Sequence, residues 1–148
     1  MITRFKEIIY MIMIFVRNVG GSIIRDVTIK IADEKDLEFM KGLQSLGINR
    51  NVASVITYLK DVKEGSSRDI EVATGMRQPE VSIAAQTLRE RGWITERNVK
   101  LESKGRPMTF YALRSTIDEI IKHYETEKTE EFAQTMETIK RLKELSSA

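Results

Sequence analysis

Apolar residues recur at helical spacing in two runs that are bounded by capping residues. Asp33 is suited to cap a helix that continues to about Leu46, and Gly47 is suited to end it. Asn49 is suited to cap a second helix, which extends to about Val62. We expect one face of each helix to be buried, through Leu37, Met40, Leu43 or Gln44 in the first and Val52, Val55, Ile56 and Leu59 in the second.

Two shorter helical patterns follow, separated by Gly75 and Met76. The first spans Arg68 to Thr74 behind a serine pair suited to cap it, and the second opens at Gln78-Pro79 and ends before Gly92. The expected core residues are Ile70, Val72 and Ala73 in the first and Val81, Ala84, Ala85 and Leu88 in the second. Two helices joined by a tight turn that contains glycine predict a helix-turn-helix, whose second helix can enter the DNA major groove.

The second helix of this motif has a polar face away from its apolar stripe. At about 100° per residue, the side chains that share this face are Gln78, Ser82, Gln86 and Arg89. Such a face is ordinarily just solvated, but Gln, Ser and Arg also hydrogen-bond base edges and phosphates. Ile83 points roughly opposite the core, where a thymine methyl is one candidate contact. Glu80 is expected to interact with the N-terminus of its own helix.

An alternating pattern continues directly behind this helix. Residues 93–99 read as a strand, 101–106 (LESKGR) as a basic turn, and 108–113 (MTFYAL) as a second strand. A hairpin behind a recognition helix is a wing, and Lys104, Gly105 and Arg106 would lie at its tip, within reach of a minor groove. Trp93 is expected to pack under the hairpin.

The N-terminal part of the chain is less informative. Residues 23–31 alternate as a half-buried strand does. Residues 8–16 are continuously apolar apart from the Tyr10 hydroxyl, and this run is about half of the roughly 20 residues that span a bilayer as a helix. Three interpretations stay open for it: a buried packing helix or strand, a peripheral membrane or partner-binding arm, or an upstream extension that is not part of the natural product.

The last segment predicts one long helix. Ser115 is suited to cap it, and no proline or glycine interrupts the chain from Thr116 to about Leu145. Its apolar positions are Ile117, Ile120, Ile121, Tyr124, Phe132, Met136, Ile139, Leu142 and Leu145. We prefer a dimerisation helix to a helix folded back on its own core, because two symmetric half-sites require two motifs at a fixed spacing. His123 is expected at the surface.

Composition and charge exclude several classes of functional site. The 148 residues suit one domain, and the absence of cysteine, with one histidine, excludes disulfides, Cys/His zinc sites and a Cys–His nucleophile pair. No Gly-rich phosphate loop or metal-ligand cluster is visible, so we expect neither an enzyme nor a cofactor. The net charge is only +2, but residues 68–114 carry 9 Lys and Arg against 6 Asp and Glu, whereas residues 115–148 carry 5 against 8. Excess positive charge therefore lies on the helix-turn-helix and hairpin.

The run ERGWI, the charged hairpin and the run KGRPMTFYAL resemble the winged-helix transcription regulators of archaea and bacteria, above all the MarR-like and TrmB-like groups. The resemblance covers about residues 33–114, and its most distinctive residues are Gly105, Arg106, Pro107, Tyr111 and Leu113. It implies that the second helix reads bases, that the wing contacts phosphates or the minor groove, and that the protein binds as a dimer. By position it implicates Arg77, Gln78, Ser82, Ile83, Gln86, Arg97, Lys104 and Arg106, to which the polar face adds Arg89.

We therefore expect a protein of the mainly α (α+β) class. It would consist of a winged helix-turn-helix domain followed by a long C-terminal dimerisation helix. Its parts would be an apolar arm or extension (1–22), the DNA-binding domain (23–114) and the C-terminal helix (115–148). The expected function is a cytoplasmic, homodimeric, sequence-specific regulator of transcription that binds double-stranded DNA, without a membrane partner. The alternative is a winged-helix protein–protein interaction module in a transcription-related complex. The sequence indicates no effector ligand.

Overall fold

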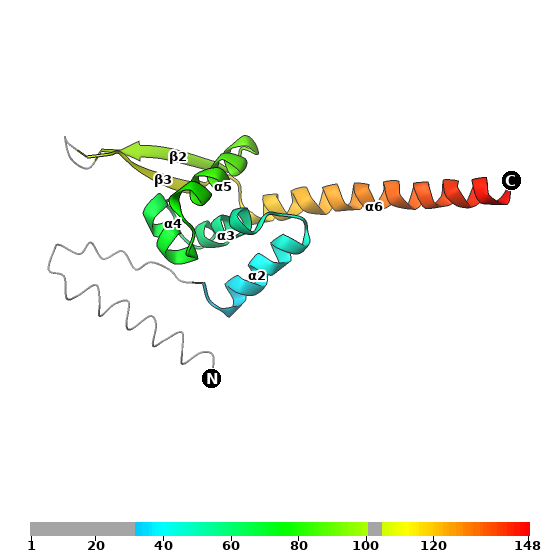
Figure 1. Ribbon diagram of the computed structural model, residues 1–148, viewed down its shortest axis with the longest axis horizontal. Helices are drawn as coiled ribbons and strands as arrows, with labels where there is room; N and C mark the ends of the chain where they lie inside the picture. Colours follow the sequence, from blue (N-terminus) through cyan, green and yellow to red (C-terminus); the bar gives the residue numbers. More distant parts are fainter. Residues whose placement is uncertain (1–31, 101–104) are drawn as a thin grey trace.

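The computed structural model describes residues 32–100 and 105–148. In chain order the elements are α2 (Glu34–Ser45), α3 (Arg50–Leu59), β1 (Gly65–Ser66), α4 (Ser67–Thr74), α5 (Gln78–Glu90), β2 (Ile94–Val99), β3 (Met108–Leu113) and α6 (Ile117–Ser147). Helices α2 to α5 cluster together, the β2–β3 hairpin extends from one side, and α6 projects away as a single rod (Figure 1). The arm expected at 1–22, the strand expected at 23–31 and Lys104 lie outside the described residues.

Helices α2, α3, α4 and α6 begin where short polar side chains cap them. Asp33 and Asp36 cap α2 reciprocally, since each carboxylate accepts the other residue's backbone N–H, at 2.9 and 3.1 Å. The same reciprocal arrangement opens α4 and α6, so three helix starts are held by hydrogen bonds between residues three positions apart. The cap of α6 is Thr116, not Ser115 as predicted, because the Ser115 N–H is directed to the Trp93 carbonyl oxygen at 3.4 Å.

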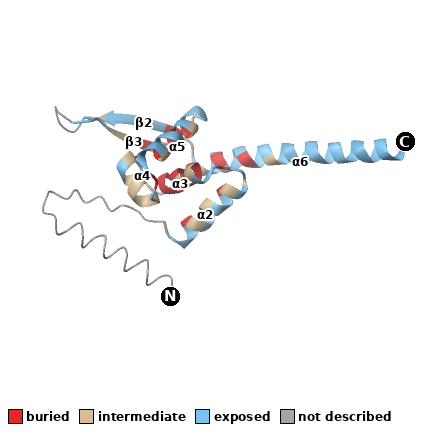
Figure 2. Ribbon diagram, viewed as in Figure 1, coloured by how far each residue is buried: buried red, intermediate tan, exposed pale blue. Residues whose placement is uncertain are grey.

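The core lies between α3, α4 and α5, and α3 is its centre (Figure 2). Every residue predicted to be buried in α3 and α5 is buried: Val52, Val55, Ile56, Leu59, Val81, Ala84, Ala85 and Leu88. In α2 only Leu43 of the predicted apolar set is fully buried, and in α4 only Ile70, while Val72 and Ala73 are half-buried. Helix α3 ends at Leu59 rather than near Val62, because the chain then turns to reach the sheet.

The sheet has three antiparallel strands in the order β1-β3-β2. Strands β2 and β3 form the predicted hairpin, with Ile94 opposite Leu113 and Val99 opposite Met108. Strand β1 was not predicted from the sequence; it pairs Gly65 with Tyr111 and Ser66 with Phe110. Two residues are too few to show a period of two, so only the pairing with the distant β3 reveals this strand.

Trp93 is packed into the core at the start of the hairpin. Its buried indole also meets the first turns of α6, with ring centroids 5.4 Å from His123 and 5.7 Å from Tyr124. The Arg91 guanidinium lies 5.0 Å from the same indole and donates a hydrogen bond to the Tyr124 hydroxyl at 2.8 Å. His123 is exposed, as expected, and its ring also contacts the Trp93 indole edge-on.

Helix α6 touches the rest of the described structure only near its start. Ile120 and Tyr124 are buried, whereas from residue 129 onward every residue is exposed (Figure 2). The apolar residues left exposed on this helix are Ile121, Phe132, Met136, Ile139, Leu142 and Leu145, with Phe132 at 67%. In the described parts of the chain, no helix meets the length and apolarity that a bilayer span requires.

Candidate nucleic-acid interface

The turn between α4 and α5 is defined by short, local hydrogen bonds. Gly75 adopts φ +74°, in the left-handed region that favours glycine, and its N–H donates to the Glu71 carbonyl at 2.9 Å. The Thr74 hydroxyl accepts the Met76 N–H at 3.3 Å, and the Met76 side chain is buried. The two helices are therefore joined by the tight glycine-containing turn that the sequence predicted.

The N-terminus of α5 is closed by its own glutamate. The Glu80 carboxylate accepts the Arg77 backbone N–H at 2.7 Å, which confirms the expected interaction between Glu80 and the helix N-terminus. Pro79 occupies the first turn, where a missing N–H leaves no hydrogen bond unmade. The one negative charge in the first turn of α5 is thus engaged with the backbone.

The two faces of α5 differ sharply in exposure. Its core stripe is sealed against α3 and α4, whereas the predicted recognition residues Gln78, Ser82, Ile83, Gln86 and Arg89 are all exposed. Ile83 is 66% exposed and is the one large apolar side chain that α5 leaves at the surface. The preceding residue, Arg77, is also exposed at the start of the helix.

Two side chains of this face have partners within the chain. The Gln86 amide donates to the Glu90 carboxylate at 3.1 Å, and an Arg89 guanidinium nitrogen lies 3.4 Å from a Glu96 carboxylate oxygen. Both interactions are exposed to solvent, where such pairs contribute only about 0–1 kcal/mol. A ligand with phosphates or base edges can therefore compete for either side chain.

The β2–β3 hairpin lies next to α5 (Figure 1). The Thr109 hydroxyl hydrogen-bonds the Asn98 side chain at 2.9 Å, which ties the two strands together near their outer end. Arg106 is exposed before β3. Tyr111, part of the motif that resembles a wing, is instead buried in the core, and burial raises the pKa of its hydroxyl, with Glu96 raising it further and Arg89 lowering it.

Arg97 is the predicted contact residue most constrained by the fold. Its guanidinium donates to both oxygens of the Glu64 carboxylate, through Nε at 2.6 Å and through Nη2, and lies 4.8 Å from the centre of the Phe110 ring. The hydrogen bonds from Arg97 lower the pKa of Glu64, and the same pairing raises the pKa of Arg97. The sequence did not point to Glu64, because Glu64 and Arg97 are 33 positions apart. No local pattern of residues relates a loop residue to a strand that far along the chain.

Among the described residues, no group of three or more His, Cys, Asp or Glu side chains could hold a metal ion. The described surface formed by α5 and the hairpin offers hydrogen-bond donors and acceptors, exposed arginines that include Arg77, Arg89, Arg97 and Arg106, and the exposed Ile83. Such a surface is suited to binding.

The comparisons with known proteins give little beyond this geometry. No protein-family model matches the sequence, and no curated protein matches it. A solved structure described as a crystal structure of a transcriptional regulator is similar to this chain with a TM-score of 0.45 and 21% sequence identity. The similarity covers 55% of this chain and 56% of that one, so it spans about half of each.

Proposed function

We propose that this protein is a transcriptional regulator of the winged-helix type, similar to the archaeal MarR-like and TrmB-like groups, that binds double-stranded DNA sequence-specifically. The observation that carries the proposal is the asymmetry of α5, with one face sealed in the core and a polar face exposed along the whole helix around Ile83. An α-helix fits the major groove of B-DNA, which is about 12 Å wide. The hairpin beside α5 would then serve as the wing.

The roles of the residues follow from their chemistry. Gln78, Ser82 and Gln86 would hydrogen-bond base edges, and Ile83 would contact a thymine methyl. The cations would contact phosphates or enter the minor groove: Arg77, Arg89, Arg97, Lys104 and Arg106. Affinity would depend mainly on the cations and specificity on the polar face of α5. A role on the chromosome would place the protein in the cytoplasm.

A homodimer through α6 belongs to the same proposal. A helix of this length spans about 46 Å, and its outer half exposes apolar residues that the rest of the described chain leaves uncovered. Phe132, Met136 and Ile139 lie on one face at spacings of four and three residues, as in the seam of a coiled coil. A second copy packed there would set the distance between two recognition helices and so between two half-sites.

Fluorescence anisotropy with a randomised duplex library, followed by sequencing of the bound fraction, tests the proposal. We expect salt-dependent binding, and a palindromic motif among the selected sequences. Arg106→Gln should weaken binding to all duplexes. Gln86→Ala should instead reduce the preference for one base at a single position, by about 1–3 kcal/mol of binding free energy. Arg141→Gln, which removes the same charge from the far end of α6, is the matched control. Absence of binding at low salt would refute the assignment.

An interaction module for another protein is the second candidate, and the ion pairs favour it. Two of the proposed phosphate contacts, Arg89 and Arg97, are already paired with Glu96 and Glu64. An exposed isoleucine beside compensated charges also suits a protein surface. Binding that is indifferent to salt and to nucleic acid would support this candidate over DNA binding.

A further inference from the structure

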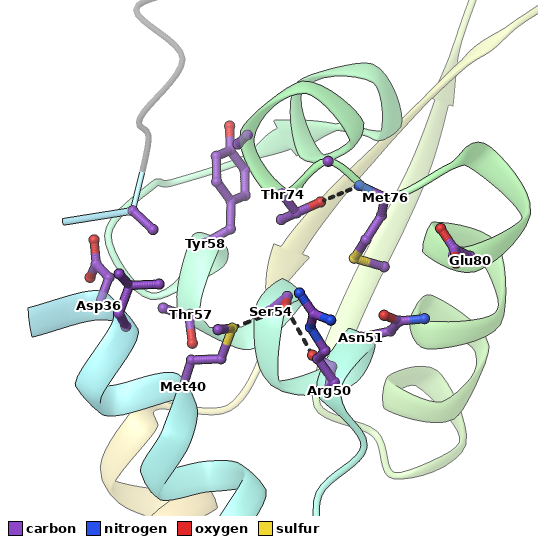
Figure 3. Close-up of a pocket in the computed structure, with 14 residues that line it drawn as sticks. Asp36, Met40, Arg50, Asn51, Ser54, Thr57, Tyr58, Thr74, Met76 and Glu80 are labelled. Carbon is purple, nitrogen blue, oxygen red and sulfur yellow. Dashed lines mark hydrogen bonds between the residues drawn. The ribbon is translucent and has the colours of Figure 1, made fainter. Parts of the chain in front are cut away.

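A cavity of about 340 Å³ lies behind the helix-turn-helix, between α2, α3, the turn after α4 and the first turn of α5 (Figure 3). Small-molecule sites typically measure roughly 300–1,000 Å³, so this cavity is large enough for a small organic ligand. None of the residues proposed to contact DNA lines this cavity, so the proposed DNA contacts do not account for it.

Both apolar and polar groups line the cavity. Met40 of α2 and Met76 of the turn contribute thioether side chains, and Ala73 adds a further apolar surface. Methionine is unbranched and adapts to the shape of what it packs against. Arg50 and Asn51, at the start of α3, extend their polar ends toward the space between α3 and the turn (Figure 3).

The acidic groups in the wall are occupied, whereas the arginine is not paired within the described chain. Asp36 accepts hydrogen bonds from the Lys60 ammonium at 2.7 Å and from the Asp33 N–H, and Glu80 accepts the Arg77 N–H. Within residues 32–100 and 105–148, Arg50 forms no ion pair, and the Asn51 side-chain amide has no hydrogen-bond partner. A guanidinium beside an amide is suited to a carboxylate, which accepts two parallel hydrogen bonds from arginine.

We propose that this cavity is a binding site for a small organic carboxylate with an apolar tail. The carboxylate would contact Arg50 and Asn51, and the tail would lie against Met40, Ala73 and Met76. On the α3 side of the cavity, the Thr57 hydroxyl donates to the Ala53 carbonyl at 2.7 Å. The Ser54 hydroxyl lies 2.8 Å from the Arg50 carbonyl oxygen and 3.1 Å from the Met40 sulfur.

The position of the cavity connects such a ligand with DNA binding, an inference that rests on the proposed function. Thr74, Gly75 and Met76 form the turn that sets where α5 starts, and Glu80 lies in the first turn of α5. A ligand that contacts both the turn and α3 favours one position of α5 relative to α3. By linkage, it then changes the affinity for DNA by the same factor by which DNA changes the affinity for the ligand.

Calorimetric titration of the full-length protein with hexanoate, compared with hexanamide, tests the site. The amide has the same tail and no charge, so hexanoate should bind saturably and at least about tenfold more tightly. Arg50→Gln should remove that advantage while leaving hexanamide binding unchanged, and Lys41→Gln, an equal loss of charge on the exposed side of α2, should change neither. Arg50 is exposed at a helix start, so the variant retains the core, which a thermal melt verifies.

The outcomes separate the site from its regulatory role. No saturable hexanoate binding, or binding that Arg50→Gln leaves intact, overturns the site. Saturating hexanoate should shift the affinity of the wild-type protein for its selected duplex by about fivefold or more, and no shift overturns the regulatory role. If the wild-type protein binds hexanoate but no duplex, the proposed function fails and the carboxylate site stands.

Discussion

Arg97 and Glu64 form a bidentate ion pair that reaches across β3, the middle strand of the sheet. Arg97 lies on β2, Glu64 precedes β1, and β3 runs between them with Phe110 under the guanidinium. Arg97 and Phe110 are cross-strand partners, so the stacking follows from the register. The pair fixes the side chain of a proposed DNA contact and compensates its charge.

Release of Arg97 should strengthen DNA binding. Glu64→Gln removes the carboxylate that holds the guanidinium, so the affinity for any duplex should rise, and the slope of log K against log salt should steepen by about 1. Anisotropy titrations over a range of salt concentrations measure both. Glu38→Gln, an equal change of charge on the exposed side of α2, is the control, and an equal gain in that variant would show that only net charge matters.

The same ion pair should give the stability of the protein a defined pH dependence. Arg97 holds the pKa of the Glu64 carboxyl below its ordinary value of 4.5, so the folded state favours the ionised carboxylate. This contribution is complete above the unfolded-state pKa and is lost as the pH falls through the lower folded-state pKa. Urea unfolding should therefore show a constant difference between wild type and Glu64→Gln from about pH 5 to 8, which diminishes in more acidic solution. A difference that grows on acidification would contradict the pairing.

Two apolar residues of α5 should respond in opposite ways to truncation. Leu88 is completely buried, so Leu88→Ala should lower the free energy of unfolding by about 2–5 kcal/mol. Ile83 is exposed, so Ile83→Ala should leave stability within about 0.5 kcal/mol and weaken binding to the selected duplex. Chemical denaturation and gel shifts on both variants check this. A loss of stability in Ile83→Ala without a change in DNA affinity would place Ile83 in an internal contact.

Gly65 should be intolerant of a side chain because Tyr58 lies against it. A Cβ at Gly65 would be 2.6 Å from the Tyr58 Cε1 atom, so Gly65→Ala must displace either the ring or β1 and should destabilise the fold by about 1–3 kcal/mol. Gly42 is the matched control. A Cβ added at Gly42 in α2 would have nothing within 4 Å, and Gly42→Ala should stabilise the helix by about 0.5–1 kcal/mol. Thermal unfolding of both variants tests whether a side chain at position 65 lowers stability by displacing Tyr58.

The outer half of α6 should carry the dimer contact. Phe132→Glu places a charge in the exposed apolar face, and the protein should then become monomeric by light scattering coupled to size exclusion, with weaker binding to a palindromic duplex. Gln134→Glu adds a charge to a different face of the same helix and should leave the mass unchanged. A wild-type protein that stays monomeric at all concentrations would rule out this interface.

The elements that could be predicted from the residues alone are those whose determinants are local. Asp33 and Ser66 open helices through hydrogen bonds to residues three positions away, Gly75 ends α4, and the spacing of Val81, Ala84, Ala85 and Leu88 marks the buried face of α5. The same applies to β3, whose bounds the alternation predicted. Caps and periodicity involve neighbours in the chain, so the residues themselves carry the information.

The way in which distant segments meet became visible in the folded structure. Folding made Gly65–Ser66 a strand, paired Glu64 with Arg97, turned the Trp93 indole toward α6 and left the cavity beside Arg50. Each of these depends on side chains that lie far apart in sequence and come together when α3, α4 and α5 close around one core. Contacts of this kind depend on packing and register, which no local pattern of residues specifies.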